Sequence, residues 1–132
     1  MVHKVEFRVR YYDTDQMGVA NHAHYLRWLE VGRAEFLRYI GMTIAQMEKA
    51  GCHIVIKEAK IDYRAPARYD ELLAIETRLA ELRTKGMRFE YKIKRGRDLI
   101  AEAYTVHVCT DFGAKPRDMP PVVRKKLEKA LD

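Results

Sequence analysis

Serine is absent from all 132 residues of the chain. No Gly-x-Ser-x-Gly motif can therefore be present, and hydrolases that use a serine nucleophile are excluded. Cysteine occurs only at Cys52 and Cys109, whose spacing matches neither a zinc site nor a disulfide framework. We interpret both cysteines as small buried hydrophobic residues.

Long apolar runs are also missing. No uninterrupted stretch approaches the roughly 18 residues that a transmembrane helix requires. The chain begins MVHKVE, which places an acid where a signal peptide needs apolar residues and favours a cytoplasmic protein. There is no internal repeat or linker, and a hydrophobic content of 48% is sufficient for the core of one domain over residues 1–132.

Basic residues exceed acidic ones and give a formal net charge of +6. This charge is compatible with a polyanion or with a phosphorylated small molecule as ligand. No RNA- or DNA-binding motif accompanies it, and the aromatic residues alternate as core residues of strands do. A nucleic acid is therefore the least favoured partner.

A long helix is predicted from about residue 22 to residue 40. Asn21 is a favoured N-cap, and Gly41 supplies the left-handed residue that ends a helix. The apolar stripe of this helix comprises Leu26, Leu29, Arg33, Phe36, Leu37 and Ile40. Thr43 and Gln46 have the spacing of a capping box, which indicates a short second helix.

Strands account for most of the remaining chain. Alternating patterns predict strands at residues 4–12, 53–63, 73–79, 87–93 and 99–110, followed by a short basic helix at 121–131. A slip in the alternation between Ile56 and Ala59 predicts a β-bulge. One long helix followed by antiparallel strands in series defines an α+β domain, with the helix laid across a curved sheet. The last strand is apolar on both faces, so we expect a partner subunit.

The segment YYDTDQMGVANHAHYLRWLEVGR gathers acids and histidines where the long helix begins. The first helical residue, His22, has a backbone N–H without an intrahelical partner, and the helix dipole adds partial positive charge there. Asp15 lies beyond a turn at which Gly18 permits a positive φ, so its carboxylate can return to face the helix start. A carboxylate opposite an oxyanion donor is a minimal apparatus for acyl transfer.

Such a sparse site suits a thioester better than an amide. Amide cleavage needs a general acid for the basic leaving amine, whereas a thiol with a pKa of about 8.5 leaves easily. The positive net charge also fits a phosphate-bearing carrier of the thioester.

Each residue of this segment has a simpler interpretation as well. Asp13 and Asp15 can cap a turn, as aspartates in loops usually do, and His22 and His24 can be solvated residues of the first helical turn. A metal site built from these four side chains is conceivable. Positions 22 and 24 do not share a helix face, however, so no metal is predicted.

The same residues resemble a known family. Arg8-Val9, Thr14-Asp15, the run from Gly18 to His22, and Tyr25 are similar to the active-site signature of the 4-hydroxybenzoyl-CoA thioesterase-like branch of the hotdog-fold superfamily. The resemblance is greatest to the small bacterial acyl-CoA thioesterases of the Tol–Pal-associated type, and it extends in element order to KPRDMP near the end. It departs at Ala20, where the family more often has valine.

This resemblance implies a hotdog fold, in which an antiparallel sheet wraps the long helix, and an acyl-CoA thioesterase without a cofactor. It also implies dimers with a continuous sheet and an active site at their interface, usually assembled into homotetramers. Asp15 matches the catalytic carboxylate, as nucleophile or general base, and His22 matches the residue whose backbone N–H polarises the carbonyl. Tyr11 matches a pocket tyrosine, and Gly18 and Tyr25 of the same motif are further candidates for substrate binding.

The phosphates of CoA should meet basic residues near the cleft. The candidates are Arg64, Arg68, Lys85, Arg88, Lys115 and Arg117, each of which can equally be an ordinary surface charge. The sequence leaves open the acyl group, aliphatic or aromatic, and the carrier, CoA or acyl-carrier protein. Two alternatives to the enzyme are a non-catalytic acyl-CoA or acyl-carrier-protein binding module and a hotdog dehydratase or hydratase.

Overall fold

The computed structural model describes every residue from Met1 to Asp132. Its strands are β1 (Val2–Arg8), β2 (His53–Tyr63), β3 (Leu72–Arg83), β4 (Gly86–Arg95) and β5 (Asp98–Thr110). Its helical segments are the short 3-10 turn η1 (Tyr11–Asp13) and the helices α1 (His22–Tyr39), α2 (Ile44–Lys49) and α3 (Pro121–Ala130). The α+β class predicted from the sequence is confirmed.

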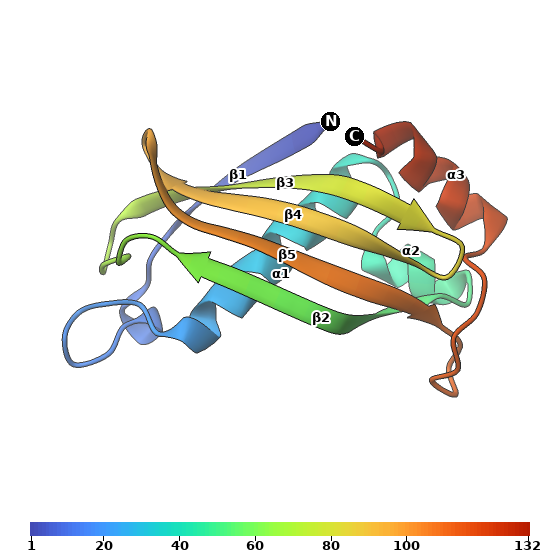
Figure 1. Ribbon diagram of the computed structural model, residues 1–132, viewed down its shortest axis with the longest axis horizontal. Coiled ribbons are helices and arrows are strands. Elements are labelled where there is room, and N and C mark those ends of the chain that lie inside the picture. Colours follow the sequence, from blue (N-terminus) through green and yellow to red (C-terminus); the bar gives the residue numbers. More distant parts are fainter.

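The strands form one antiparallel sheet in the order β1-β3-β4-β5-β2 (Figure 1). β3, β4 and β5 are neighbours both along the chain and in the sheet. β2 pairs with β5, however, and β1 occupies the edge beside β3. The strands after the long helix are therefore not a simple meander, and β2 is left as the second edge of the sheet.

β1 is shorter than predicted, because the chain leaves the sheet after Arg8. It turns into η1, where the Asp13 carboxylate accepts the Arg10 N–H at 2.9 Å. The predicted bulge in β2 is present, since the pairing of β2 with β5 shifts register between Ile56 and Glu58.

α1 crosses one face of the sheet (Figure 1). Its predicted ends are confirmed: the Asn21 side chain accepts the Ala23 N–H at 2.9 Å, and Gly41 has a φ of 82°. Phe36 packs edge-on against Phe89 of β4, with ring centroids 5.7 Å apart.

Most of the predicted stripe of α1 is buried against the sheet, together with Tyr25, Trp28 and Gly32. Leu26 departs from this prediction, because it is 46% exposed. It lies beside β2 at the edge of the sheet, where no further strand of this chain covers it.

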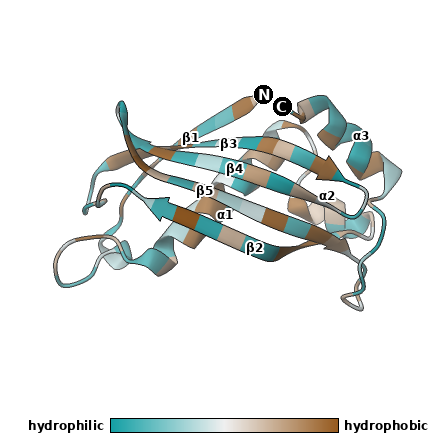
Figure 2. Ribbon diagram, in the orientation of Figure 1, coloured by the Kyte–Doolittle hydropathy of each residue, from teal (hydrophilic) through white to brown (hydrophobic).

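The strands alternate between hydrophobic and hydrophilic residues (Figure 2). The hydrophobic side meets α1, and every second residue of β4 from Met87 to Ile93 is buried. The opposite side carries ion pairs, including Arg78 with Glu90 and Arg88 with Glu90. The sheet therefore has one core face and one polar face in this chain.

α3 packs at the end of β3, with Val123 and Leu127 fully buried. The chain termini lie close together (Figure 1), and the N-terminal ammonium is 2.7 Å from the Asp132 carboxylate. No helix combines the length and apolar character needed to cross a membrane.

Both cysteines are buried, as predicted. Their sulfur atoms lie only 2.7 Å apart, because Cys52 precedes β2 and Cys109 ends the neighbouring β5. Burial, reinforced by the contact with Cys109, raises the pKa of Cys52 to about 12, so this thiol is protonated at neutral pH.

Candidate active site

The segment between η1 and α1 is folded back on itself. Thr14 and Ala20 form an antiparallel bridge, and the Val19 carbonyl accepts the Asp15 N–H at 3.0 Å. Gly18 has a φ of 74°, which confirms the predicted positive φ, and its N–H donates to the Asp15 carbonyl at 3.0 Å. We call residues 14–20 the Asp15 loop.

The Asp15 carboxylate is exposed and oriented by its own loop. Its Oδ1 accepts the Met17 N–H at 2.8 Å and the Val19 N–H at 3.3 Å. The turn-capping interpretation of this aspartate is thus confirmed. The hydrogen bonds restrain the side chain without burying it, and an exposed carboxylate keeps free lone pairs for a ligand.

The start of α1 is anchored against the same loop. The Asn21 N–H donates to the Asp13 carbonyl at 3.0 Å, and the Ala20 N–H donates to the Ala67 carbonyl at 2.8 Å. Because Asn21 is the N-cap, the N–H of His22 has no intrahelical acceptor. Free N–H groups and the helix dipole make this a place that favours negative charge.

Asp13 has a different environment from Asp15. It is 1% exposed, and its Oδ1 lies 3.2 Å from Nδ1 of His24. The His22 ring instead packs against Tyr63 of β2, with centroids 4.7 Å apart. Of the four side chains considered for a metal site, the structure therefore brings only Asp13 and His24 together.

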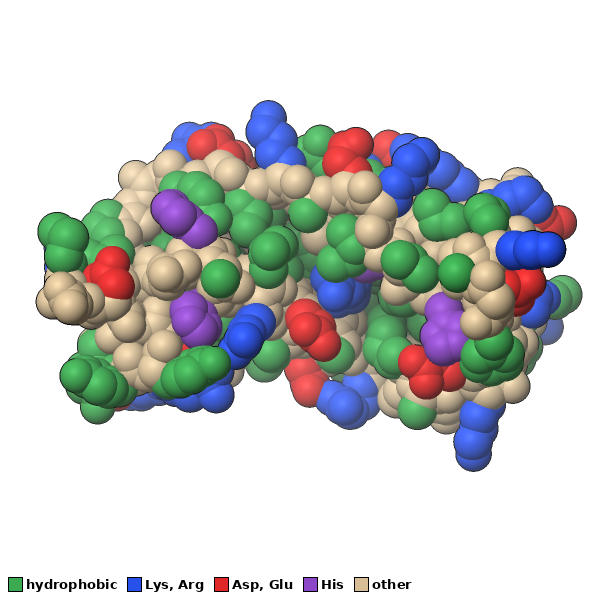
Figure 3. Space-filling model, turned by 90° about the horizontal axis from the view of Figure 1, so that it is seen from below, with side chains coloured by type: hydrophobic (Ala, Val, Ile, Leu, Met, Phe, Trp, Pro, Cys, Tyr) green, Lys and Arg blue, Asp and Glu red, His purple; other side chains and the backbone are tan.

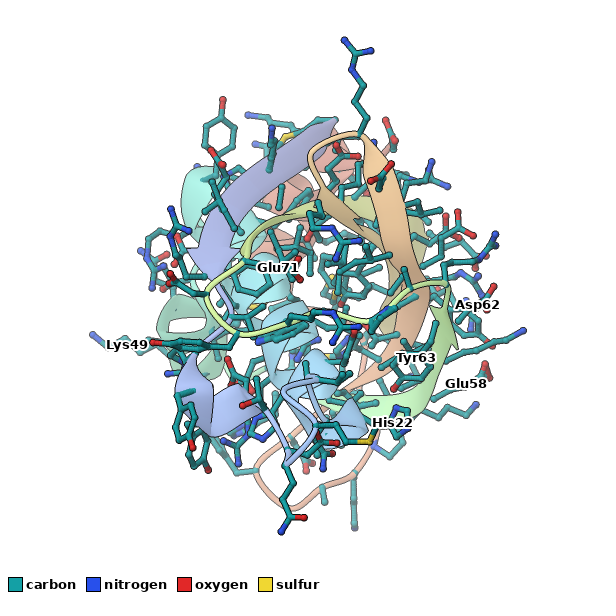
Figure 4. The ribbon with its side chains drawn as sticks, turned by 90° about the vertical axis from the view of Figure 1, so that its left-hand side faces the viewer. His22, Lys49, Glu58, Asp62, Tyr63 and Glu71 are labelled. Carbon is teal, nitrogen blue, oxygen red and sulfur yellow. The ribbon has the colours of Figure 1, made fainter.

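A shallow groove of about 420 Å³ opens between the first turns of α1 and the end of β2. It is lined by His22, Ala23 and Leu26 from the helix and by Ala59, Ile61 and Tyr63 from the strand. Figure 4 shows His22 and Tyr63 beside each other at this end of the molecule. The groove is largely apolar and lies next to the free N–H of His22.

Tyr25 lies behind this groove and is buried. Its ring is 4.9 Å from that of Tyr63 and 4.6 Å from that of Trp28. Burial, together with the neighbouring Tyr63, raises the pKa of Tyr25, so its phenol stays neutral at physiological pH. In this chain Tyr25 supports the groove wall through packing.

The sequence pattern of the Thioesterase-like superfamily matches residues 9–127. The chain belongs to this superfamily. The resemblance found in the motif around Asp15 is thereby confirmed at the level of the family.

Relatives and solved structures agree with this assignment to the superfamily. Acyl-CoA thioesterase YbgC of Haemophilus influenzae is 35% identical over 119 residues, which cover 89% of this chain and 88% of that protein. The crystal structure of protein TT1821 of Thermus thermophilus has a TM-score of 0.92 and 35% identity, covering 96% of this chain and 98% of that one.

DHNA-CoA thioesterase of Staphylococcus aureus has a TM-score of 0.91 and 25% identity, covering 97% of this chain and 89% of that one. These comparisons confirm the hotdog fold.

The predicted pocket tyrosine and two of the predicted basic candidates lie at the same end of the molecule. Tyr11 is exposed on η1 and packs edge-on against Tyr69, with centroids 5.8 Å apart. Arg68 forms a backbone bridge with Val19 of the Asp15 loop. Arg64 follows β2 and pairs through its guanidinium with Asp62 and Glu102.

The remaining basic candidates are not near Asp15 within one chain. Arg88 lies on the polar face of the sheet, with its guanidinium 3.9 Å from the centre of the Tyr104 ring. Lys115 and Arg117 belong to the loop after β5, at the opposite end of the molecule from the Asp15 loop (Figure 1). Lys85 lies at that end too and pairs with Asp118 at 2.5 Å.

The β2 side of the groove was not anticipated. Ala59, Ile61 and Tyr63 read in the sequence only as alternating strand residues. Nothing in their spacing indicates that β2 lies beside the start of α1, because this contact follows from β2 pairing with β5 at the far edge of the sheet.

Proposed function

We propose that this protein hydrolyses the thioester of an acyl-CoA to the free acid and CoA. The observation that carries the proposal is the Asp15 loop, which is hydrogen-bonded back on itself directly before the free N–H of His22. Membership of the thioesterase-like superfamily and the name of the Haemophilus influenzae relative support the substrate class.

In the proposed reaction, the thioester carbonyl lies at the start of α1 and its oxygen accepts the His22 N–H. As the carbonyl carbon becomes tetrahedral, negative charge grows on this oxygen, and the N–H and the helix dipole stabilise it. The N–H is already in place before the reaction, so little reorganisation is required.

Asp15 takes one of two roles. As a general base it removes a proton from water while the hydroxide attacks the carbonyl carbon. As a nucleophile it attacks the carbon itself, and water then cleaves the resulting anhydride. In both routes the C–S bond breaks, the CoA thiolate leaves and takes up a proton, and the free acid is released.

The acyl group has a place beside this carbonyl. The apolar groove formed by Leu26, Ala59 and Ile61 adjoins His22 and can hold an aliphatic or aromatic group. Arg64 and Arg68 flank the same end of the molecule and are the best-placed candidates for the CoA phosphates within one chain. Arg88, Lys115 and Arg117 can serve only if another subunit brings them to the cleft.

We also propose that the active unit is a dimer joined along β2 and that dimers associate into a homotetramer. β2 is a sheet edge of eleven residues, and it exposes Val55, Ile56 and Tyr63. An exposed, apolar edge strand favours pairing with another strand. A partner seated there would cover the groove beside His22 and turn it into a closed cleft.

The test is Asp15→Asn, which keeps the size of the side chain and removes its charge. We expect a fall in kcat of at least about a hundredfold, measured as thiol release from a panel of aliphatic and aromatic acyl-CoAs. The matched control is Asp111→Asn. Asp111 makes an equivalent pair of loop hydrogen bonds, to Gly113 and Lys115, at the other end of the molecule.

If Asp15 only capped its turn, the two variants would behave alike. Turnover by Asp15→Asn within about tenfold of the unmodified protein would overturn the catalytic assignment. Binding of acyl-CoAs without hydrolysis of any of them would instead indicate a binding module.

A further inference from the structure

The side chain of Arg33 lies inside the molecule. It is 8% exposed and extends from the middle of α1 toward the sheet. Its Nη1 donates to the Tyr91 hydroxyl at 3.1 Å, and this hydroxyl is 2.6 Å from Oγ1 of Thr105. Thr105 in turn lies 2.8 Å from Nε2 of His107, so Arg33 ends a chain of buried hydrogen bonds.

No carboxylate compensates the charge of this guanidinium. Glu30, the acid on the same side of the helix, is one turn away, and no Asp or Glu oxygen lies within 4.0 Å of a guanidinium nitrogen of Arg33. Arg38 on the same helix shows the contrast, because it is exposed and paired with Glu35. A buried cation without a counter-ion is costly, so an anion that reached Arg33 would be bound favourably.

A hollow of about 360 Å³ gives access to Arg33. Its walls come from α1, α2 and the start of β2, and they include Ala34, Ile44, Met47 and Ile54. Figure 3 shows a hollow on the β2 side of the molecule with basic and histidine side chains at its floor. Apolar walls above a cationic floor suit a ligand with an apolar body and an anionic end.

The two acids that line this hollow do not form an ion pair with the guanidinium of Arg33. Glu48 lies 3.7 Å from the His53 imidazole, and Glu30 is exposed at the rim. Of the charged residues that line the hollow, Arg33 is the one that is buried. Its planar guanidinium can bind both oxygens of a carboxylate at once, which a lysine in the same place could not do.

The hollow and the groove beside His22 follow one seam between α1 and β2. On the helix, residues 22, 26, 30 and 33 recur at three- and four-residue steps and share a face. On the strand, Tyr63, Ile61 and Ala59 line the groove, and Val55 and Ile54 line the hollow. Arg33 lies eleven residues beyond His22, about 16 Å along α1.

We propose that this seam holds a long acyl chain whose far end carries a carboxylate, and that Arg33 binds this carboxylate. The substrate class is then the mono-CoA thioester of a long dicarboxylic acid. The position of the thioester at the start of α1 rests on the proposed function, whereas the carboxylate site at Arg33 rests on the burial of the guanidinium and the hollow in front of it.

The first experiment compares matched esters that differ only at the far end. The central pair is dodecanoyl-CoA and the mono-CoA thioester of dodecanedioic acid. Further pairs have shorter or longer acyl chains. We expect the intact protein to prefer the carboxylate-ended ester by at least about tenfold in kcat/KM. The preference should arise mainly in KM, because Arg33 does not contact the reacting carbonyl.

Arg33→Met keeps the length of the side chain and removes its charge, and it should bring the preference ratio close to one. Arg33→Lys keeps a charge but not the planar fork, and it should give an intermediate ratio. The matched control is Arg38→Met, which removes an exposed cation from the same helix and should leave the ratio unchanged. Replacement of a buried ion by an apolar residue is often tolerated, and thermal unfolding of each variant checks this.

The second experiment does not depend on turnover. Calorimetric titration of the protein with free dodecanedioate should show binding that Arg33→Met weakens at least about tenfold, with free dodecanoate as the reference ligand. Such binding without hydrolysis of any ester would support the carboxylate site and refute the proposed function. Hydrolysis with equal kcat/KM for both members of every pair would refute the carboxylate site and leave the proposed function standing.

A loss of the dimer in Arg33→Met, with the preference ratio unchanged, would also overturn the proposal. It would show that Arg33 meets a carboxylate of a second copy of the chain.

Discussion

Oδ1 of Asp13 lies 3.2 Å from Nδ1 of His24 in the first turn of α1, and the carboxylate is buried. Its Oδ2 accepts the Arg10 N–H at 2.9 Å, so this aspartate joins the end of η1 to the first turn of the helix. Two aspartates separated by one residue therefore have different roles. Asp13 fixes the segment in place, whereas Asp15 remains open to solvent.

Asp13→Ala should lower the free energy of unfolding by about 1–3 kcal/mol, because it removes the buried carboxylate that accepts the Arg10 N–H and adjoins the His24 ring. Denaturant unfolding followed by circular dichroism measures this change. Asp98→Asn, at the exposed aspartate that begins β5, is the control and should stay within about 0.5 kcal/mol. An Asp13→Ala protein as stable as the control would show that the buried pair contributes nothing.

Gly32 permits the close approach of α1 to β3. A Cβ at this position would lie 2.6 Å from Oγ1 of Thr77 and 2.9 Å from Cδ1 of Ile75. Gly32→Ala should therefore destabilise the protein by about 1–3 kcal/mol through overpacking, although alanine is the better helix former by about 1 kcal/mol. Thermal unfolding tests this, and a higher melting temperature would mean that the helix can move away from the sheet at no cost.

Local patterns predict much of this fold because the elements are set by short-range chemistry. The bounds of α1 follow from a capping side chain at Asn21 and a left-handed Gly41, and the bulge in β2 follows from a slip in its alternation. The order of the strands in the sheet could not be predicted in this way. Pairing of β2 with β5 and of β1 with β3 depends on contacts between segments far apart in the chain.

The residues of the candidate site likewise fall into those that the sequence alone identifies and those that only tertiary packing brings together. Asp15, Gly18 and His22 lie in one contiguous motif, so the sequence alone identifies them. The groove residues of β2, and the hydrogen-bonded chain from Arg33 to His107, come together only through tertiary packing. Arg33 is predicted on the apolar stripe of the helix, but its missing counter-ion is visible only once the surrounding residues are placed.

The exposed edge of β2 predicts that a charged residue placed on this strand disrupts the dimer. Ile56 is 45% exposed, so Ile56→Lys should cost little in a monomer but should disrupt a dimer joined along this strand. We expect light scattering to give a smaller mass than for the unmodified protein at micromolar concentration, with a parallel loss of thioester hydrolysis. Val122→Lys, at a residue 57% exposed on α3, is the control and should change neither.

An unmodified protein that is monomeric at this concentration would refute the dimer. An Ile56→Lys protein of unchanged mass would place the interface elsewhere.

His107 predicts a pH dependence of stability. Its burial, together with the positive charge of Arg33, lowers its pKa from the ordinary 6.5 to about 3. The folded protein therefore keeps this imidazole neutral between these values, whereas the unfolded chain takes up a proton once the pH falls below about 6.5. Unfolding is thus favoured by acid, and His107 lowers stability progressively as the pH falls through this window.

His107→Gln should remove this part of the pH dependence while keeping a polar group beside Thr105. One proton contributes a slope of about 1.4 kcal/mol per pH unit, so between pH 6 and pH 4 the unmodified protein should lose about 2–3 kcal/mol more than the variant. Denaturant midpoints measured across this range give the two slopes. His53→Gln, at a half-buried histidine near Glu48, is the control and should retain the steeper slope. Parallel curves for the protein and for His107→Gln would mean that the buried imidazole takes up its proton without unfolding.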